Sequence, residues 1–491
     1  MPSTNSAHAF TNPRERIPDI TATGVNVPTE TFHTSTVADA VQPLDARRTS
    51  DVTAVDFPTI TQLTSSTTKL SAILPPLIFG TATFNHQFNP DPYALGPNDI
   101  VHAALYHGIR AFDTSPYYGP AEEILGAALH SPLVKTDPVL SHLQRSDYFL
   151  LTKCGRIKGD EFDYSPPWIR LSIARSLARL HTDYLDVVYL HDVEFMSPAE
   201  VLTGIRTLRA IRAETRAVRH VGICGYPVDV LAALAELVLS ETGEPVDIVQ
   251  SYANYTVQNQ RLGGQLARFV GAGVEVVANA SPLGMGLCRS QGVPVGTSGG
   301  VWHPAPDGLR RKCKEAAEWV GGEGERLENV AVRFAVEGWM QEGSMVGSRG
   351  VTPAEAVRML KSGRQVDVPE RAERQGEQKP RLGVNVMGVS ALSELQDTMA
   401  VYGDALAARS DTDTNTNSRG QQVKDMVEHI RKNILGDEWA DYAWESPEPG
   451  FVNTREKFGV SEVEMEEFER VYGDAKGQSQ VEVMEIFGDS D

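Results

Sequence analysis

The stretch from residue 148 to residue 192 decides the fold prediction. It reads YFLLTKC at 148–154, WIRLSIARSLARL at 168–180 and DVVYLHD at 186–192. The first and third segments are nearly continuous apolar runs, which are typical of parallel strands covered on both faces. The middle segment has apolar residues three and four positions apart, as one face of a helix requires. The stretch therefore predicts two strands of a parallel sheet with a helix between them.

The same alternation of apolar runs and amphipathic segments extends along most of the chain. We predict eight strands, at Leu77–Gly80, Ala111–Ser115, Tyr148–Cys154, Asp186–Asp192, His220–Tyr226, Asp247–Tyr252, Val274–Ala280 and Val384–Ser390. Helical patterns lie between them at Ile100–Arg110, Trp168–Leu180, Ala199–Arg212, Val230–Leu239 and Leu262–Val270. Eight such units favour a closed barrel, so we predict an α/β fold of the (β/α)₈, or TIM-barrel, type. A doubly wound sheet is the alternative, although no GxGxxG motif follows the first predicted strand, where that fold holds a pyrophosphate.

Segments of different composition flank and interrupt the predicted barrel, which we place at residues 74–405. Residues 1–70 are rich in Ser, Thr, Pro and Asp without sustained periodicity, so we expect a disordered or loosely attached extension. Two inserts, at residues 285–310 and 342–382, follow the seventh strand and precede the eighth. The first lies on the rim where catalytic residues project, so it is a candidate cover for the substrate, whereas the second enters its strand from the opposite face.

A C-terminal extension, residues 406–491, follows the barrel. A polar stretch at 409–420 precedes a helical segment at Val423–Leu435, so we predict a helical tail. The tail then carries four large aromatic residues, Trp439, Tyr442, Trp444 and Phe451. The pattern leaves open whether they cover the barrel or a partner.

The composition argues against several classes of protein. The 491 residues carry a formal net charge of −20, which argues against a dedicated nucleic-acid binder. No apolar run approaches the roughly 18 residues that cross a bilayer. The N-terminus lacks the apolar core of a secretion signal, and its acidic residues argue against a mitochondrial one. Four cysteines, Cys154, Cys224, Cys288 and Cys313, form no CxxC pair, so we expect reduced thiols in a cytoplasmic enzyme.

Titratable residues follow three consecutive predicted strands: Asp113 and Tyr118 in FDTSPYYG, Lys153 in LLTKCG and His191 in VVYLHD. In a barrel, catalytic groups project from the carboxyl ends of the strands. A free phenol has a pKa of about 10 and is a weak base at neutral pH, but a neighbouring ammonium would lower that pKa. Alone, each residue is more often a surface, capping or core residue; together they predict an acid–base site. Beyond His191 and Asp192 there is no carboxylate–histidine cluster, so we predict no metal.

The motifs DTSPYYG, LLTKC and DVVYLHD resemble the aldo-keto reductase family in residue type, order and approximate spacing. The resemblance extends over roughly residues 74–405. It implies that Tyr118 exchanges a proton with the substrate oxygen, and that Lys153 lies beside it, bonded to Asp113. It also implies that His191 orients the substrate, and that the cofactor is a nicotinamide dinucleotide bound without a Rossmann fingerprint.

The resemblance also implies positions for that cofactor, at Gly80, Thr81, Gln250, Ser281, Leu283 and Ser390. Gln250 corresponds to an amide that hydrogen-bonds the nicotinamide carboxamide. The segment VMGVSALSELQDT resembles the loop and helix that hold the adenosine phosphate, with Ser390 at the helix start. A helix N-terminus offers free N–H groups to anions.

Three positions depart from the family pattern. Cys224-Gly225 stands where the family often has Ser-Asn, and Ala280 stands where many members stack a Tyr on the nicotinamide. Glu394 occupies the place of an Arg that grips the 2′-phosphate in NADP-dependent members. Because a carboxylate repels a phosphate and accepts hydrogen bonds from a free ribose diol, we predict NAD in preference to NADP. The alternative interpretation of Glu394 is an ordinary solvated helix residue.

The segments GICGYP, VQSYANY, NASPLGMGL and WHPAP resemble the L-galactose and D-arabinose dehydrogenase branch of the family, and the fungal D-arabinose type in particular. This implies oxidation of the C1 hydroxyl of a cyclic aldose to a lactone. Trp302 and His303 are candidate substrate contacts, with loop anchoring as the alternative role for His303. Two other functions stay open: an NADP-dependent reductase of aldehydes or ketones on the same barrel, and a non-catalytic nucleotide-binding subunit. The preferred aldose and the oligomeric state are not predicted.

Overall fold

The structure, a computed structural model, describes residues 68–295, 302–361, 379–410 and 417–473. The predicted extension at residues 1–70 lies almost wholly outside these ranges, as do parts of the two predicted inserts.

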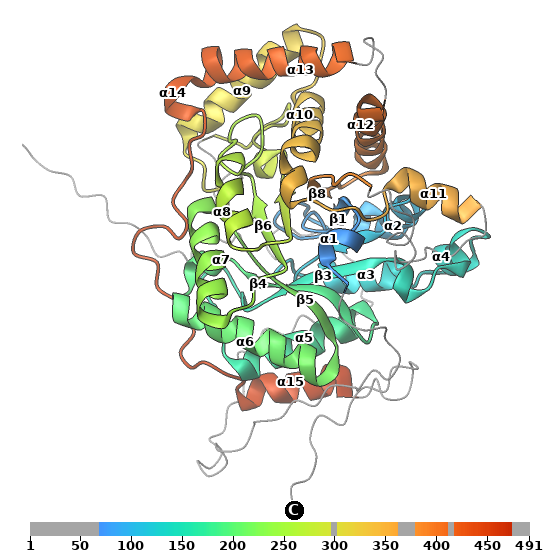
Figure 1. The fold of residues 1–491 in the computed structure, drawn as a ribbon, viewed down its shortest axis with the longest axis vertical. Helices are drawn as coiled ribbons and strands as arrows, with labels where there is room; N and C mark the ends of the chain where they lie inside the picture. The colour runs from blue at the N-terminus through green and yellow to red at the C-terminus, as the bar shows by residue number, and fades with distance from the viewer. Residues whose placement is uncertain (1–67, 296–301, 362–378, 411–416, 474–491) are drawn as a thin grey trace, which may run out of the picture.

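Eight parallel strands close into a barrel in chain order, with β8 pairing with β1 (Figure 1). They are β1 Leu77–Gly80, β2 Ala111–Asp113, β3 Phe149–Cys154, β4 Leu185–His191, β5 Val218–Gly225, β6 Ile248–Tyr252, β7 Val276–Ala280 and β8 Val384–Gly388. The predicted (β/α)₈ barrel and its eight strands are confirmed, with strand ends that differ from the prediction by two residues or fewer. A doubly wound open sheet is excluded by the closure.

The alternation of side chains along each strand decides which of them enter the barrel. Leu151 and Tyr189 belong to the apolar cluster inside it. Leu150, the neighbour of Leu151 on the same strand, packs instead in the cluster between the sheet and the helices. Lys153 and His191 follow two positions after Leu151 and Tyr189. With a period of two, they also point inward, at the carboxyl end of the barrel.

Helices cover the outside of the sheet (Figure 1). Those between the strands are α2 Pro97–Tyr106, α3 Ala121–Leu129, α4 Pro132–Thr136, α5 Pro166–Leu180, α6 Pro198–Thr215, α7 Val228–Thr242, α8 Leu266–Gly271, α9 Asp307–Gly322, α10 Leu327–Glu342 and α11 Pro353–Lys361. Thus α2, α5, α6, α7 and α8 confirm the five predicted helices, while α3, α4, α9, α10 and α11 were not predicted.

Local chemistry explains the helix ends that differ from the prediction. Helix α6 begins early because Ser197 and Glu200 form a reciprocal capping box, with Pro198 at the first helical position. Helix α2 ends at Tyr106 because Gly108 turns the chain with a φ of +90°. A side chain at Gly108 would place its Cβ 2.2 Å from the carbonyl oxygen of Pro353.

The amino end of the barrel is closed by the short helix α1, Leu70–Ile73. Leu70 and Leu74 are buried in the same apolar cluster as the inward-facing strand residues. Ser348 donates its hydroxyl to the Leu74 carbonyl, which ties this segment to the chain that leads into α11. The barrel therefore starts a few residues before the predicted boundary at Leu74.

The C-terminal extension is partly helical, as predicted. Helix α12, Leu392–Ser410, crosses the predicted boundary; α13, Asn417–His429, then continues through a π-helical turn into α14, Gly436–Trp439. These last elements pack on α9 and α10 around a second apolar cluster. The chain then runs along the molecule to α15, Glu462–Tyr472, at its opposite end (Figure 1).

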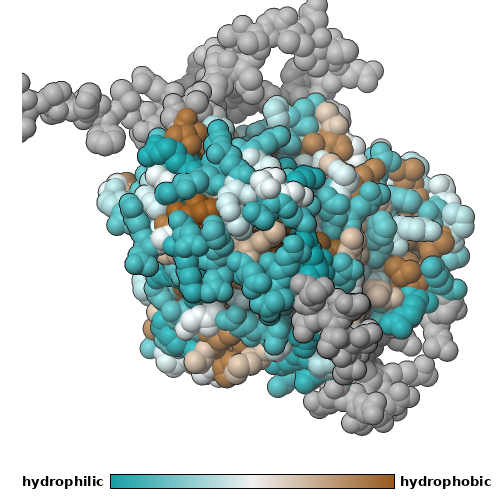
Figure 2. All heavy atoms as spheres, turned by 90° about the horizontal axis from the view of Figure 1, so that it is seen from above, coloured by the Kyte–Doolittle hydropathy of each residue, from teal (hydrophilic) through white to brown (hydrophobic). Residues whose placement is uncertain are grey.

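Figure 2 shows one face that is mainly hydrophilic, with hydrophobic residues in small, separate groups. Among the described helices, none has both the length and the apolar character of a membrane span.

Candidate active site

Three strand ends bring the predicted acid–base residues together. Asp113 ends β2, Lys153 is the penultimate residue of β3 and His191 ends β4. Lys153 Nζ donates to Asp113 Oδ1 at 2.7 Å and to the Thr114 carbonyl at 2.9 Å. The same nitrogen lies 4.7 Å from the centroid of the Tyr118 ring. Lys153 and Tyr118 are therefore neighbours on one rim, as the acid–base prediction required.

Burial changes the electrostatics of this group from the sequence-based expectation. Burial raises the pKa of Tyr118 above its usual value, and the opposing effect of Lys153 is smaller. We expected a net lowering, so that expectation was wrong in direction, although Lys153 does act in the predicted sense. Burial disfavours the ammonium of Lys153, but Asp113, together with smaller effects of Tyr118 and Cys224, more than offsets burial, so the pKa of Lys153 is raised. The resting site thus pairs a charged Lys153 with a neutral phenol.

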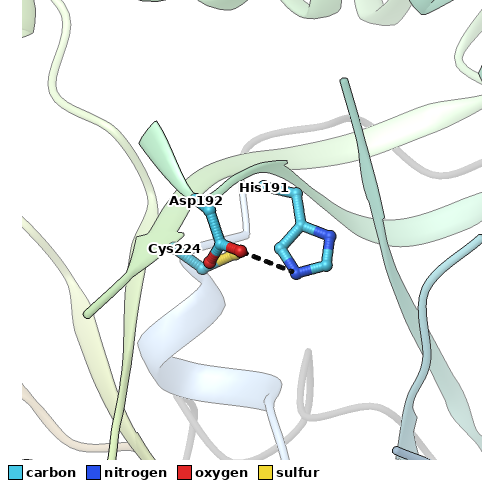
Figure 3. Close-up of side chains that lie close together, drawn as sticks. All are labelled: His191, Asp192 and Cys224. Carbon is cyan, nitrogen blue, oxygen red and sulfur yellow. Dashed lines mark ion pairs between the residues drawn. The ribbon is translucent and has the colours of Figure 1, made fainter. Parts of the chain in front are cut away.

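His191 is held as a neutral imidazole. Burial, and then the positive charges of Lys153 and Arg156, put its pKa well below its usual value. Its Nδ1 lies 3.0 Å from Ser115 Oγ, and its ring meets the Tyr118 ring edge-on at 5.8 Å. The other nitrogen, Nε2, lies 3.7 Å from Asp192 Oδ2 (Figure 3), beyond hydrogen-bond distance, so it can still donate to a substrate oxygen.

These residues form the floor of a cavity of about 770 Å³, a size typical of small-molecule sites. One arm of the cavity runs to the start of α12 and is lined by Gly80, Gln250, Ser281, Leu283, Ser390 and Glu394. We call it the nucleotide arm. Thr81 does not line it, because the Thr81 side chain is buried and donates to the Asp113 carbonyl.

The nucleotide arm offers hydrogen-bonding groups that fit a nicotinamide dinucleotide. Gln250 Oε1 is buried and, among the described residues, has no hydrogen-bond partner. A carboxamide N–H would satisfy that oxygen, which otherwise remains a costly unpaired acceptor. Ser390 lies immediately before α12, where an anion finds free N–H groups.

Glu394 partly occupies that anion site. Its Oε2 accepts the Ser390 backbone N–H at 2.7 Å, and its Oε1 accepts Arg289 Nη2 at 2.8 Å. Glu394 is therefore a paired capping residue that lines the cavity, not simply a solvated helix residue.

The rest of the cavity lining, which includes Trp302 and residues of the C-terminal extension, is here called the substrate arm. Trp302 lines the cavity and packs edge-on against Phe88 at 5.0 Å. His303 does not line it: the ring is buried, faces the Gly284 carbonyl at 3.2 Å and accepts the Ala305 N–H at 3.0 Å. Burial lowers the pKa of His303 to about 4. This placement corresponds to the alternative role for His303, anchoring of the loop.

Sequence reasoning missed the wall of the substrate arm that the C-terminal extension provides. Residues 440–461, here called the C-terminal strap, connect α14 to α15, and residues 444–446 and 448–452 line the cavity. Trp444 stacks on Tyr226 with ring centroids 4.3 Å apart and an angle of 7°. At least one of the tail aromatic residues therefore covers the barrel.

Both ends of the strap are anchored to the barrel. Gln258 donates to the carbonyls of Trp439 and Tyr442 at 2.9 and 3.0 Å. Asn453 exchanges two hydrogen bonds with the Phe162 backbone, at 3.0 and 2.9 Å. These contacts fix the strap over the loops that follow β3 and β6.

A buried carboxyl, Glu194, fixes the middle of the strap. Glu194 Oε1 accepts the Ser446 hydroxyl at 2.9 Å and the Tyr226 N–H at 3.0 Å. A Cβ on Gly225 would lie 2.1 Å from Glu194 Oε2. Gly225, in the unusual Cys224-Gly225 pair, thus makes room for this carboxyl.

A potential metal-ligand cluster also lies on this rim. Figure 3 shows Asp192 and Cys224 beside the His191 imidazole, with ligand atoms within 4.8 Å of one another. Cys224 adds a thiol to the His191–Asp192 pair that the sequence revealed. Asp192 is already paired with Arg156, and Lys153 is close enough to lower the pKa of His191. Two cations therefore oppose a third positive charge, which argues against a metal ion at this cluster.

Comparison with known proteins agrees with this geometry. A family model described as "Aldo/keto reductase family" matches residues 76–408. D-arabinose 1-dehydrogenase of Saccharomyces cerevisiae is 37% identical over 291 residues, covering 59% of this chain and 82% of that protein. L-galactose dehydrogenase of Arabidopsis thaliana is 35% identical over 283 residues, covering 56% and 81%. D-threo-aldose 1-dehydrogenase of a Pseudomonas species is 26% identical over 312 residues, covering 57% and 87%.

Proposed function

The chain belongs to the Aldo/keto reductase family, and from that membership and the site geometry we propose that it oxidises the C1 hydroxyl of a cyclic aldose to the aldonolactone with NAD(P)⁺. The observation that carries the proposal is the contact of Lys153 with both Asp113 and Tyr118 on the floor of a deep cavity. Three relatives named as sugar dehydrogenases support the substrate class.

The chain's own residues would move the proton. Tyr118 acts as the phenolate, which the ammonium of Lys153 stabilises, and it becomes a neutral phenol when it takes the proton of the C1 hydroxyl. Asp113 keeps Lys153 charged and in place. His191 donates from its free nitrogen to the C1 oxygen and holds C1 near the nucleotide arm. A nicotinamide bound in that arm would accept the C1 hydrogen with its electron pair.

Glu394 supports NAD as the preferred cofactor. Its carboxylate accepts the Ser390 backbone N–H before the start of α12 and forms an ion pair with Arg289. A 2′-phosphate would meet this negative charge, whereas a ribose diol could donate to it. We accordingly propose NAD ahead of NADP.

Reduction of an aldehyde or ketone with NADPH is the second candidate. The raised pKa of Tyr118 keeps the phenol protonated at neutral pH, which suits proton donation to a carbonyl. Glu394 argues against this cofactor. A non-catalytic subunit is a weaker candidate, because it has no need for four assembled acid–base residues. We also propose a cytoplasmic location, for which the four free, buried cysteines are supporting evidence.

The test is a spectrophotometric screen for NADH formation with D-arabinose, L-fucose, L-galactose and L-xylose, repeated with NADP⁺. A parallel assay follows NADPH oxidation with a hydroxyl-free aromatic aldehyde. The proposal expects aldose-dependent NADH formation that Tyr118→Phe abolishes. Aldehyde reduction without any aldose oxidation would replace it by the reductase function.

A further inference from the structure

We propose that Arg156 is a specificity-determining residue that donates hydrogen bonds to a ring hydroxyl of a neutral aldose in the substrate arm. The inference rests on the proposed function and names a contact that the acid–base residues do not provide.

The chain after β3 turns back so that Arg156 reaches the cavity. Gly155 has a φ of +94°, and a Cβ there would lie 2.2 Å from the Tyr164 ring. The Tyr164 hydroxyl donates in turn to the His191 carbonyl at 2.7 Å. Arg156 then pairs in an isolated bridge with Phe162. The backbone under Arg156 is thereby fixed to the same strand end that carries His191.

The guanidinium of Arg156 is held on three sides. Nη1 donates to Asp192 Oδ2, and Nε donates to the Lys158 carbonyl at 3.4 Å. Its Cζ lies 3.9 Å above the centroid of the Tyr117 ring, a cation–π contact. Among the described residues, Nη2 has no hydrogen-bond partner, and the side chain is 15% exposed where it lines the cavity. One edge of a fixed planar donor therefore faces the space beside Tyr118 and His191.

Charge balance favours a neutral ligand over an anionic one. Asp192 is 2% exposed and neutralises Arg156, just as Asp113 neutralises Lys153. Glu194, the next carboxyl along the chain, is also buried close enough to Asp192 for the two to interact. A substrate carboxylate would be repelled by these acids, and among the described residues around Arg156 no unpaired cation would balance its charge. A hydroxyl needs only a donor, and a preorganised guanidinium supplies it at little entropic cost.

A structural role is the competing explanation, because Arg156 also packs against aromatic rings. Arg156→Met removes the donor but leaves Asp192 unpaired and buried, which can destabilise the fold. The double variant Arg156→Met/Asp192→Asn removes both charges and keeps the comparison interpretable. Lys158→Met is the matched control, because Lys158 lies in the same loop, is 73% exposed and does not line the cavity.

The experiment compares kcat/KM for an aldose, for its singly deoxygenated analogues and for a hydroxyl-free aromatic aldehyde. We expect the Arg156 variants to lose about 10- to 100-fold on the parent aldose, mainly in KM, as for a hydrogen bond to a charged group. One deoxy analogue lacks the hydroxyl that Arg156 contacts, so the unmodified protein should already use it poorly. On this analogue the Arg156 variants should show no further loss of kcat/KM. Aldehyde reduction should change less than threefold, and Lys158→Met should change nothing.

Each other outcome overturns the inference. Equal losses on the aldose and the aldehyde indicate a structural role for Arg156, and unchanged aldose kinetics indicate no role. The contact is also excluded if the double variant and the unmodified protein have the same ratio of kcat/KM for the parent aldose to kcat/KM for every deoxy analogue. If the unmodified protein oxidises no aldose, the proposed function fails together with this inference. If the unmodified protein oxidises the aldose and the Arg156 variants do so with unchanged kcat/KM, the proposed function stands and only this inference is overturned.

Discussion

Lys153 Nζ lies 4.7 Å from the centroid of the Tyr118 ring while it donates to Asp113 at 2.7 Å. The ammonium thus serves two partners: a carboxylate that keeps it charged, and a phenol whose ionised form it stabilises. Without Lys153, the same burial would raise the pKa of Tyr118 further and make its phenolate form rarer.

Removal of the Tyr118 hydroxyl tests this arrangement directly. Tyr118→Phe keeps the ring that packs beside His191 and removes only the proton-transfer atom. We expect kcat/KM to fall about 10²- to 10⁴-fold for aldose oxidation, as for loss of a general acid–base group. Binding of the dinucleotide, followed by fluorescence titration, should be nearly unchanged. Turnover within tenfold of the unmodified protein would assign the proton transfer to another residue.

The pH profile of the reaction should reflect the raised pKa of Tyr118. Burial puts this pKa above its usual value of about 10, so the phenolate fraction is small at pH 7 and grows with pH. The logarithm of kcat/KM for oxidation should therefore rise from pH 6 to pH 9 without a plateau. Aldehyde reduction, which needs the phenol, should not rise over this range. A plateau for oxidation near pH 7 would contradict the dominance of burial.

Cofactor choice should respond to the charge of Glu394. Glu394→Gln keeps an oxygen that accepts the Ser390 N–H and removes the negative charge beside the expected 2′-phosphate. We expect kcat/KM with NADP⁺ to rise about fivefold, which corresponds to roughly 1 kcal/mol for a partly exposed charge. The value with NAD⁺ should stay level or fall. If the ratio of the two values does not change, Glu394 does not set the cofactor preference.

Stability should depend on pH through Glu194. Burial, and then the Asp192 carboxylate, raise the pKa of Glu194 to about 8, whereas an unfolded Glu titrates near 4.3. Between about pH 4.3 and pH 8 the folded protein keeps a proton that the unfolded chain has lost. The free energy of unfolding should therefore fall as pH rises through this window, by at most about 1.4 kcal/mol per pH unit.

Urea unfolding at pH 6 and pH 8.5 measures this effect. Glu194→Gln removes the ionisable group, so the free energy of unfolding of this variant should fall less between the two pH values than that of the unmodified protein. Glu466→Gln, at an exposed position on α15, should keep it. Equal decreases in the unmodified protein and Glu194→Gln would show that the proton resides elsewhere, for example on Asp192.

The sequence predicted the parts of the site that depend on local periodicity. Nearly continuous apolar runs predict parallel strands with Lys153 and His191 at their carboxyl ends, and the structure has both residues there. It did not predict Arg156, although this residue follows Cys154 by two positions, because its direction depends on the turn at Gly155. The contact of Glu194 with Ser446 joins residues 252 positions apart, and no local pattern encodes such a pairing.

The sequence also misled in one physical respect. Proximity of an ammonium to a phenol can be anticipated from motifs, so the lowering effect of Lys153 on Tyr118 was predicted. The opposing cost of burial depends on how completely the loops and the strap cover the site, which only the folded chain determines. Burial is the larger effect in the structure.

The C-terminal strap should shape the substrate arm through Trp444. This side chain is 6% exposed, stacks on Tyr226 and lines the cavity. Trp444→Ala should cost about 3–5 kcal/mol of stability, as for other buried aromatic residues, and should also raise KM for the aldose. Phe468→Ala on α15 is the matched control, since Phe468 is 4% exposed and does not line the cavity. We expect a similar loss of Tm in both variants and a raised KM only in Trp444→Ala. This result would show that Trp444 shapes the pocket in addition to stabilising the extension. If KM rises equally in both variants, the strap acts on the substrate only by holding the fold together.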